Sequence, residues 1–208
     1  MMSATYPIQL RLQTRSVLVA GAGPVAARKL ERLVICGAQI RVVASHVSKA
    51  VRALAQAHQF ACEERAFRDE DVQAAFLVIA ATDDAQVNER IALLARAAGA
   101  LVLRVDAPEQ SDFALPAFTH TDHVEATIST RGKAPAASRR LSRELTAWLL
   151  QGPERFAAEV ARARLLLATR KDSSARLRAL ADGALFDACR TRDDTRIAEL
   201  VTSIVEAP

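Results

Sequence analysis

Aromatic residues are scarce in this sequence, and the shortage narrows the classes of protein that it can encode. Phe, Trp and Tyr make up 4% of the 208 residues, with one Trp and one Tyr. We therefore expect no aromatic stacking platform for nucleic acid, and no helix-turn-helix pattern is present either. The single tyrosine, Tyr6, precedes the first predicted strand. The Tyr-x-x-x-Lys pair of an ordinary alcohol or ketone dehydrogenase is thus missing.

Cysteine and long apolar runs are also in short supply. Cys36, Cys62 and Cys189 are widely spaced and odd in number, so we expect reduced core residues of a cytoplasmic protein. No run of about 18 uncharged apolar residues occurs, which predicts no membrane association through a spanning helix. The N-terminal stretch MMSATYPIQLRLQTRS lacks the apolar region and cleavage site of a signal peptide.

Apolar residues are plentiful overall, and basic residues are in slight excess. The hydrophobic fraction is 50% and the formal net charge is +4. The first value is typical of a globular protein with a substantial core. The second favours an anionic partner without naming one.

The first half of the chain alternates between short apolar runs and amphipathic stretches. Strands are predicted at 17–21 (VLVAG), 40–44 (IRVVA), about 62–67, 76–82 (FLVIAAT) and 100–106 (ALVLRVD). Helical spacing lies between them, and the last helix runs from a cap at Asp83 or Asp84 to a stop at Gly99. This alternation predicts an α/β fold, a Rossmann-like parallel sheet with helices on both faces.

The pattern changes after residue 112. FALPAFTH and HVEATISTRG have the character of extended segments, and the remainder is helical almost to the end, with breaks near Gly183 and Asp193. We therefore predict a dinucleotide-binding domain at 1–112, a small β connector at 113–132 and a helical region at 133–208. Trp148 is expected in the core or in a dimer interface.

A glycine-rich turn joins the first strand to the first helix. Gly21-Ala-Gly23-Pro24-Val25-Ala26 fits the G-x-G-x-x-G/A fingerprint of dinucleotide-binding folds. The first Gly makes the tight turn, the second lets the backbone approach a pyrophosphate, and the small Ala26 lets the helix pack on the sheet. Free N–H groups at the helix start would face the anion. The alternative is that the glycines serve helix–sheet packing only.

One part of this site is missing at the end of the second strand. An Asp or Glu for the ribose hydroxyls usually follows there, whereas this chain has Ser45 and His46. Both side chains can hydrogen-bond a ribose. His46 can also be a plain helix-start residue after a Ser45 cap. The residues alone leave NAD and NADP open, although no Arg in this loop awaits a 2′-phosphate.

Four stretches together resemble one family. They are VLVAGAGPVAARK, FLVIAATDDAQVNERI, VLRVDAPEQSDFALPA and ATISTRGKAPAASRRLSREL. They resemble the precorrin-2 dehydrogenase/sirohydrochlorin ferrochelatase family, which forms the N-terminal half of bifunctional siroheme synthase or stands alone. The resemblance covers roughly residues 6–150, and the later helices are more loosely similar to the family's dimerisation region. We expect no uroporphyrinogen methyltransferase module in this chain.

The resemblance implies a reaction with NAD as cofactor. A hydride passes from precorrin-2 to NAD, giving sirohydrochlorin, and Fe²⁺ is then inserted as a substrate to give siroheme. The family's V-D-A-P aspartate, needed for both steps, is Asp106 here. Its place at the end of a parallel strand independently suits a general base. The alternative is a turn residue ahead of Ala107-Pro108.

The resemblance also implies binding residues. The cofactor positions are Gly21, Gly23, Pro24, Val25, Ser45, His46, Thr82 and Asp83. Arg131 and Lys133, in a basic segment, are expected to bind the carboxylates of the tetrapyrrole, the alternative being a solvated helix face. A family serine that can be phosphorylated aligns with Thr130, for which we predict no modification.

Two further expectations concern metal and self-association. His120, Asp122 and His123 have the residue types of a metal site, but in a strand such spacing sends side chains to opposite faces, so no metal site is predicted. The Leu- and Ala-rich stripes of residues 134–208 predict a homodimer. Two other readings stay open: an NAD(H)-binding sensor that controls a partner without catalysis, and a family member with dehydrogenase activity only.

Overall fold

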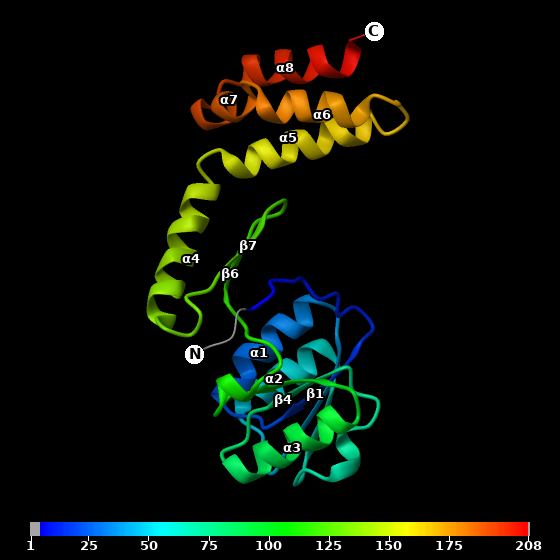
Figure 1. Cartoon of the computed structure of the whole chain (residues 1–208), viewed down its shortest axis with the longest axis vertical. Helices are drawn as coiled ribbons and strands as arrows, with labels where there is room; N and C mark the ends of the chain where they lie inside the picture. Colours follow the sequence, from blue (N-terminus) through cyan, green and yellow to red (C-terminus); the bar gives the residue numbers. More distant parts are fainter. Residues whose placement is uncertain (1–4, 208) are drawn as a thin grey trace. The chain divides into compact units, whose positions relative to one another are not determined.

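The computed structural model describes residues 5–207, which divide into two units at Leu115 and Pro116 (Figure 1). The grouping places the two short strands near residue 120 with the later helices. The predicted boundaries at 112 and 132 stay a prediction. None of the helices formed by the described residues has the length and apolar character needed to span a bilayer.

The first unit is built on a five-stranded parallel sheet with the strand order β3-β2-β1-β4-β5. The strands are β1 (Ser16–Ala20), β2 (Gln39–Ala44), β3 (Ala61–Glu64), β4 (Leu77–Ala80) and β5 (Leu101–Arg104). The helices are α1 (Pro24–Ile35), α2 (Lys49–His58) and α3 (Ala85–Ala97), with short 3₁₀ turns η1 (Asp69–Val72) and η2 (Pro108–Gln110). The predicted Rossmann-like fold is confirmed.

Alternate residues of each strand face opposite sides of the sheet, which gives the first unit two separate cores. Val17 and Val19 of β1 lie in the core that α1 and α2 cover. Leu18 and Ala20 lie in the other, beneath α3 and η1. Because both faces are covered, the central strands β1 and β4 are almost continuous apolar runs, as is typical of parallel sheets.

The ends of α3 follow the predicted signals. Asp84, rather than Asp83, is the cap, and its carboxylate accepts hydrogen bonds from the N–H groups of Gln86 and Val87. Gly99 adopts a left-handed φ of 81° directly after the helix, where the chain turns into β5. Gly99 therefore ends the helical path of the chain, and β5 begins two residues later at Leu101.

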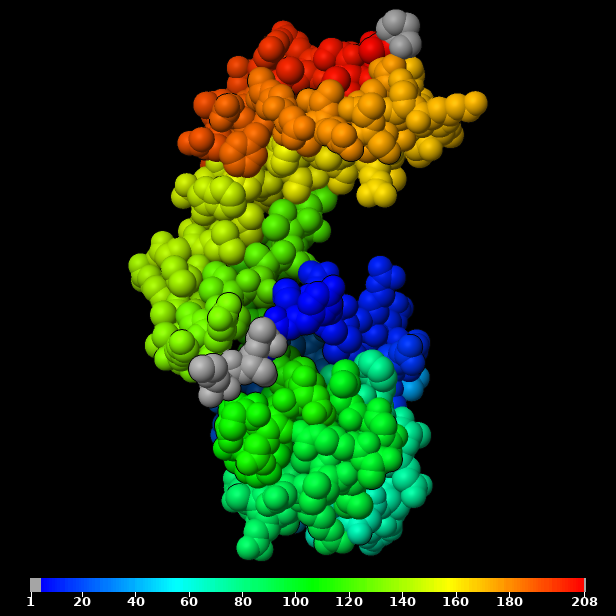
Figure 2. Space-filling view, in the orientation of Figure 1, coloured from blue at the N-terminus to red at the C-terminus, as the bar shows by residue number. Residues whose placement is uncertain are grey.

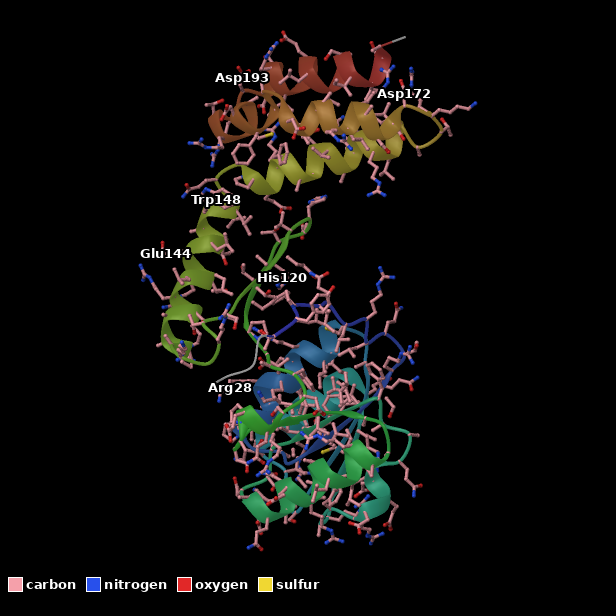
Figure 3. The ribbon with its side chains drawn as sticks, in the orientation of Figure 1. Arg28, His120, Glu144, Trp148, Asp172 and Asp193 are labelled. Atoms are coloured by element: carbon pink, nitrogen blue, oxygen red, sulfur yellow. The ribbon has the colours of Figure 1, made fainter. Side chains whose placement is uncertain are left out.

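The second unit begins with a hairpin of β6 (Ala117–His120) and β7 (Glu125–Ile128), which are antiparallel. Small polar residues of α4 (Pro135–Leu149) hold it: the Ser142 hydroxyl donates to the Phe118 carbonyl at 3.0 Å, and the hydroxyls of Thr119 and Thr146 are paired. Figure 3 shows Glu144 on the outer side of α4. The extended character expected of this segment is therefore present.

Four helices complete the second unit: α5 (Pro153–Leu166), α6 (Ser173–Asp182), α7 (Leu185–Thr191) and α8 (Asp194–Glu206). They stack into one body, coloured yellow to red in Figure 2. Its core includes Leu180, Leu185 and Cys189. Figure 3 marks Asp172 and Asp193, which immediately precede α6 and α8, and the Asp193 carboxylate accepts from the Arg196 N–H.

One expectation about burial is wrong, and another is reduced to one of its two alternatives. Cys36 is exposed, because it caps the C-terminal end of α1, where the helix leaves the sheet. Trp148 is 47% exposed, with its ring tilted against that of Phe186 of α7 at 6.5 Å between ring centroids, so it does not lie in the core, and its place in a dimer interface stays a prediction. Apolar character alone predicted burial, whereas the position of each residue on its helix decided exposure.

An ionic cluster secures the outer edge of the sheet. Asp71, 3% exposed, accepts from Arg65 at 2.6 Å and from Arg41 of β2 at 2.9 Å. The hydrogen bond from Arg65 is the main cause that holds the pKa of Asp71 well below its usual range, with burial opposing it. The carboxylate therefore ties η1 to β2 and β3 in its ionised form.

We predict that Asp71→Asn destabilises the first unit by roughly 3 kcal/mol at neutral pH, the lower end of the range for breaking a buried pair, since Glu63 still partners both arginines. The contribution of a carboxylate with a depressed pKa is present above its unfolded pKa of about 4 and is lost as the pH falls further. Urea unfolding followed by circular dichroism should show the difference at pH 7 and a smaller one at pH 3. Asp69→Asn, which breaks an exposed pair with Arg90, is the control and should leave the midpoint nearly unchanged. Equal shifts in the two variants would contradict the assignment.

Candidate functional site

The candidate site lies at the carboxyl ends of the parallel strands, where the order reverses between β1 and β4. The chain leaves β1 toward β2 on one side, whereas β4 leads to β5 on the other. Ligands of doubly wound sheets bind at this kind of switch point. Gly21 stands there with a φ of 108°, and a Cβ on it would lie 2.1 Å from the Ala81 carbonyl oxygen. Only glycine fits where the loops after β1 and β4 touch.

Gly23 is a glycine for a different reason. Its φ of −81° suits any residue, and an added Cβ would meet no protein atom within 4 Å. Neither strain nor packing requires a glycine at this N-cap. The space beside Gly23 is open, as expected if the backbone approaches a pyrophosphate at this position.

The first turn of α1 is suited to an anion. Pro24 opens the helix, and among the described residues no side chain caps it and no acidic residue lies in its first turn. Val25 is 39% exposed beside the loop, whereas Ala26 is fully buried against the sheet. Arg28, labelled in Figure 3, turns its guanidinium back toward the Pro24 carbonyl at 3.4 Å. The helix start is therefore uncapped and positively polarised.

The loop between β2 and α2 carries Ser45 and His46, both exposed. The alternative in which Ser45 caps α2 is wrong: the cap is Ser48, whose hydroxyl accepts from the Val51 N–H. The Ser48 N–H donates to the Ala22 carbonyl at 3.3 Å and so joins this loop to the glycine-rich turn. Ser45 and His46 are thereby left facing solvent, available to a ligand.

The loop between β4 and α3 is braced by a buried amide. Asn88, fully buried, accepts through Oδ1 from the Thr82 N–H at 3.0 Å and from the Thr82 hydroxyl at 2.7 Å. Its amide nitrogen donates to the Thr82 carbonyl at 3.1 Å. Thr82 is therefore fixed in place, and Asp83 beside it is exposed.

Asp106 lies two residues beyond the end of β5, not within the strand as the apolar pattern predicted. Its carboxylate pairs with Arg104, the last residue of β5, at 2.7 Å between Nη2 and Oδ2. The Arg104 side chain is 7% exposed and also donates to Gln110 at 2.8 Å. The hydrogen bond from Arg104 is the main cause that lowers the pKa of Asp106, with burial opposing it. Asp106 is thus an oriented, ionised carboxylate.

The structure brings the nine predicted cofactor and catalytic positions to one edge of the first unit, in the four loops described above. Arg131 and Lys133 belong to the second unit, where both are exposed in the turn before α4. That turn is fixed by the Thr130 hydroxyl, which accepts from the Ala134 N–H and pairs with Ser138. Their contact with a substrate stays a prediction.

The histidines of the hairpin do not gather around a common point. His120, labelled in Figure 3, stacks on Phe118, whereas Nδ1 of His123 pairs with Glu154 at 2.7 Å. Within residues 5–207 no group of three or more His, Cys, Asp or Glu side chains is arranged to hold a metal. His123 serves the contact between the hairpin tip and α5.

Three residues of this edge were not predicted from the sequence: Arg104, Asn88 and Glu64, whose carboxylate accepts from the Val47 N–H of the β2–α2 loop at 3.0 Å. An Arg that interrupts the apolar run VLRVD is a signal that could have been found, because a charge in a buried strand needs a partner nearby. Asn88 lies on the inner face of its helix, where a polar residue is equally unexpected. Glu64 gave no signal, since its strand is short and lies at the sheet edge.

Comparison with known proteins identifies the family. Residues 8–117 match the family described as "Putative NAD(P)-binding", which is more than half of the chain, and the chain belongs to it. The predicted cofactor is confirmed at the level of a nicotinamide dinucleotide.

Relatives support the resemblance stated from the motifs. The chain is 36% identical to the siroheme synthase of Neisseria meningitidis serogroup C over 144 residues, 69% of this chain and 30% of that protein. It is 33% identical to the siroheme synthase of Nitrosococcus oceani over 158 residues, 76% of this chain and 34% of that protein. The chain thus matches about a third of the length of these relatives.

A solved structure has a similar fold over 97% of this chain. SirC, precorrin-2 dehydrogenase, superimposes with a TM-score of 0.79 and covers 97% of this chain and 100% of its own, at 24% identity. At that identity the likeness concerns the fold. It extends beyond the Rossmann-like sheet to the hairpin and the later helices.

We predict opposite outcomes for the two glycines of the turn. Gly23→Val should fold normally and lose NAD affinity by about 10- to 100-fold, because a misfit costs roughly 1–3 kcal/mol where the backbone must approach the ligand. Gly21→Ala should instead destabilise the protein, by about 1–3 kcal/mol from backbone strain alone. Calorimetric titration with NAD and thermal unfolding of both variants test this. Unchanged NAD affinity in folded Gly23→Val would refute the pyrophosphate site.

Proposed function

We propose that this chain oxidises precorrin-2 to sirohydrochlorin with NAD as the hydride acceptor. The observation that carries the proposal is the ionised Asp106 carboxylate, at the same sheet edge as the glycine-rich turn of an NAD(P)-binding domain. Similarity to siroheme synthases supports the substrate class. The reaction removes a hydride and a proton together, and Asp106 is the group placed to take the proton.

The residues of the first unit have separate parts in this scheme. Gly23 and the start of α1 hold the pyrophosphate, and the Thr82 loop borders the nicotinamide end. NAD, when bound, would act as the hydride acceptor. Arg104 keeps Asp106 ionised and aims its carboxylate, while Gln110 fixes Arg104 in turn.

Two finer assignments belong to the same proposal. Arg131 and Lys133 bind carboxylates of the tetrapyrrole, the Arg131 guanidinium through two parallel hydrogen bonds and the Lys133 ammonium as a compact positive charge. The chain also inserts Fe²⁺ into sirohydrochlorin, where two pyrrole protons leave as the metal enters. Asp106 relays these protons as well, so one carboxylate serves both steps.

The protein acts as a homodimer built largely from residues 134–208. Support comes from exposed apolar side chains on α4 and α5, among them Leu141 at 50% and Leu165 at 79% exposure. Burial of these side chains against a second chain would remove apolar surface from water.

The decisive experiment is a spectrophotometric assay of precorrin-2 with NAD. Asp106→Ala should retain NAD binding and lose dehydrogenation by about 10²–10⁴-fold, the usual contribution of a general base. Asp106→Asn should lose the dehydrogenation rate to a similar extent, because it keeps the shape of the side chain and loses the charge.

The lowered pKa of Asp106 means that the parent rate should show no loss from protonation of this carboxylate between about pH 5 and 8. The same assay with Fe²⁺ tests insertion. Near-parent rates in either variant would leave Asp106 a structural residue.

The homodimer is tested by light scattering at micromolar concentration. We expect twice the chain mass of 22.5 kDa. Leu141→Glu should shift the mass toward one chain, because a charge in an apolar interface is costly to desolvate. A monomer mass for the unmodified chain would contradict the proposal.

A further inference from the structure

The ribose-binding acid missing from β2 has a counterpart on the neighbouring strand. Glu64 ends β3 and lies opposite Ala44, the last residue of β2, in the parallel register. Its carboxylate reaches over the end of β2: Oε1 accepts from the Val47 N–H at 3.0 Å and lies 3.7 Å from Nδ1 of His46. A negative charge therefore stands in the loop after β2, although the loop itself contains none.

A basic residue faces the same carboxylate. Nη2 of Arg52, in α2, donates to Oε2 of Glu64 at 2.9 Å, and the two side chains are 54% and 41% exposed. The hydrogen bond from Arg52 is the main cause that lowers the pKa of Glu64, and the one from Val47 adds to it. Glu64 is ionised, and Arg52 is occupied by it.

We propose that Glu64 takes the place of the β2 acid and makes this chain select NAD over NADP. The proposal rests on the NAD site of the proposed function and adds the residue that decides between the two cofactors. In Rossmann folds the adenosine ribose lies at the end of the second strand, where an acid accepts hydrogen bonds from its hydroxyls. NADP carries a phosphate there instead, with about −1.5 to −2 charges at neutral pH. Glu64 repels that phosphate and withholds Arg52 from it.

The neighbouring glutamate supplies a matched control. Glu63 precedes Glu64 in β3, and successive side chains of a strand point to opposite faces. Its carboxylate pairs with Arg65 at 2.7 Å and with Arg41 at 3.5 Å, in the Asp71 cluster. Removing its charge changes the net charge of the chain as much as removing that of Glu64, without touching the β2–α2 loop.

The test is calorimetric titration of the full chain with NAD and with NADP. The parent should prefer NAD. Glu64→Gln keeps an oxygen that can accept from Val47 while it removes the charge and frees Arg52. We expect the NADP-to-NAD affinity ratio to rise by about 10- to 100-fold, the usual contribution of hydrogen bonds to a charged group. Glu63→Gln should leave the ratio at its parent value. Adding Arg52→Met to Glu64→Gln should remove the gain for NADP.

Each other outcome has a distinct meaning. An unchanged ratio in Glu64→Gln, or an equal loss for both dinucleotides in a variant with a parent-like circular dichroism spectrum, would show that Glu64 only braces the loop and would overturn the proposal. A parent that prefers NADP would overturn it too. If the parent binds neither dinucleotide, the NAD site itself fails and this inference falls with it, a result that the parent titration alone reveals.

Discussion

The contact between Gly21 and the Ala81 carbonyl is the constraint on which the first unit depends. A Cβ at Gly21 would sit 2.1 Å from that oxygen, so the loops after β1 and β4 meet backbone to backbone. Asn88 then fixes the second loop through Thr82, and Ser48 ties the β2–α2 loop to Ala22. The three loops are consequently held together by backbone contacts and one buried amide, without help from the exposed side chains of Ser45 and Asp83.

At the carboxyl ends of the two outermost strands, β3 and β5, the acidic side chains are arranged in the same way. Glu64 and Asp106 each follow or end a strand, and each carboxylate is held by an arginine, Arg52 or Arg104. The pairing keeps both acids ionised and limits their rotation. It differs in depth, because Arg104 is buried and Arg52 is half-exposed. Arg104 is therefore suited to holding one geometry away from solvent, whereas the pair of Arg52 with Glu64 lies at the surface.

Much of the fold was predictable because its signals are local. Apolar runs between amphipathic stretches predicted the parallel sheet, and the glycine spacing predicted the turn before α1. The side-chain pairs were not predictable in the same way. Whether Glu64 reaches Val47 depends on which strand lies beside β2, and the pairing of Arg104 with Asp106 depends on β5 ending two residues early. The burial of Cys36 and the alternative cap at Ser45 were wrong for a related reason, since the ends of α1 and α2 depend on where the chain leaves the sheet.

In the proposed pyrophosphate site, the open space beside Gly23 means that binding and folding place different demands on this position. An added Cβ there meets no protein atom within 4 Å, so a screen for thermal stability or expression should accept a small side chain at this position. A glycine at position 21 is required by the fold, whereas a glycine at position 23 is required only by the proposed cofactor contact. Descendants released from selection for cofactor binding can accumulate side chains at position 23 and remain well folded. In a set of related chains, the residue at this position should therefore indicate which chains retain cofactor binding.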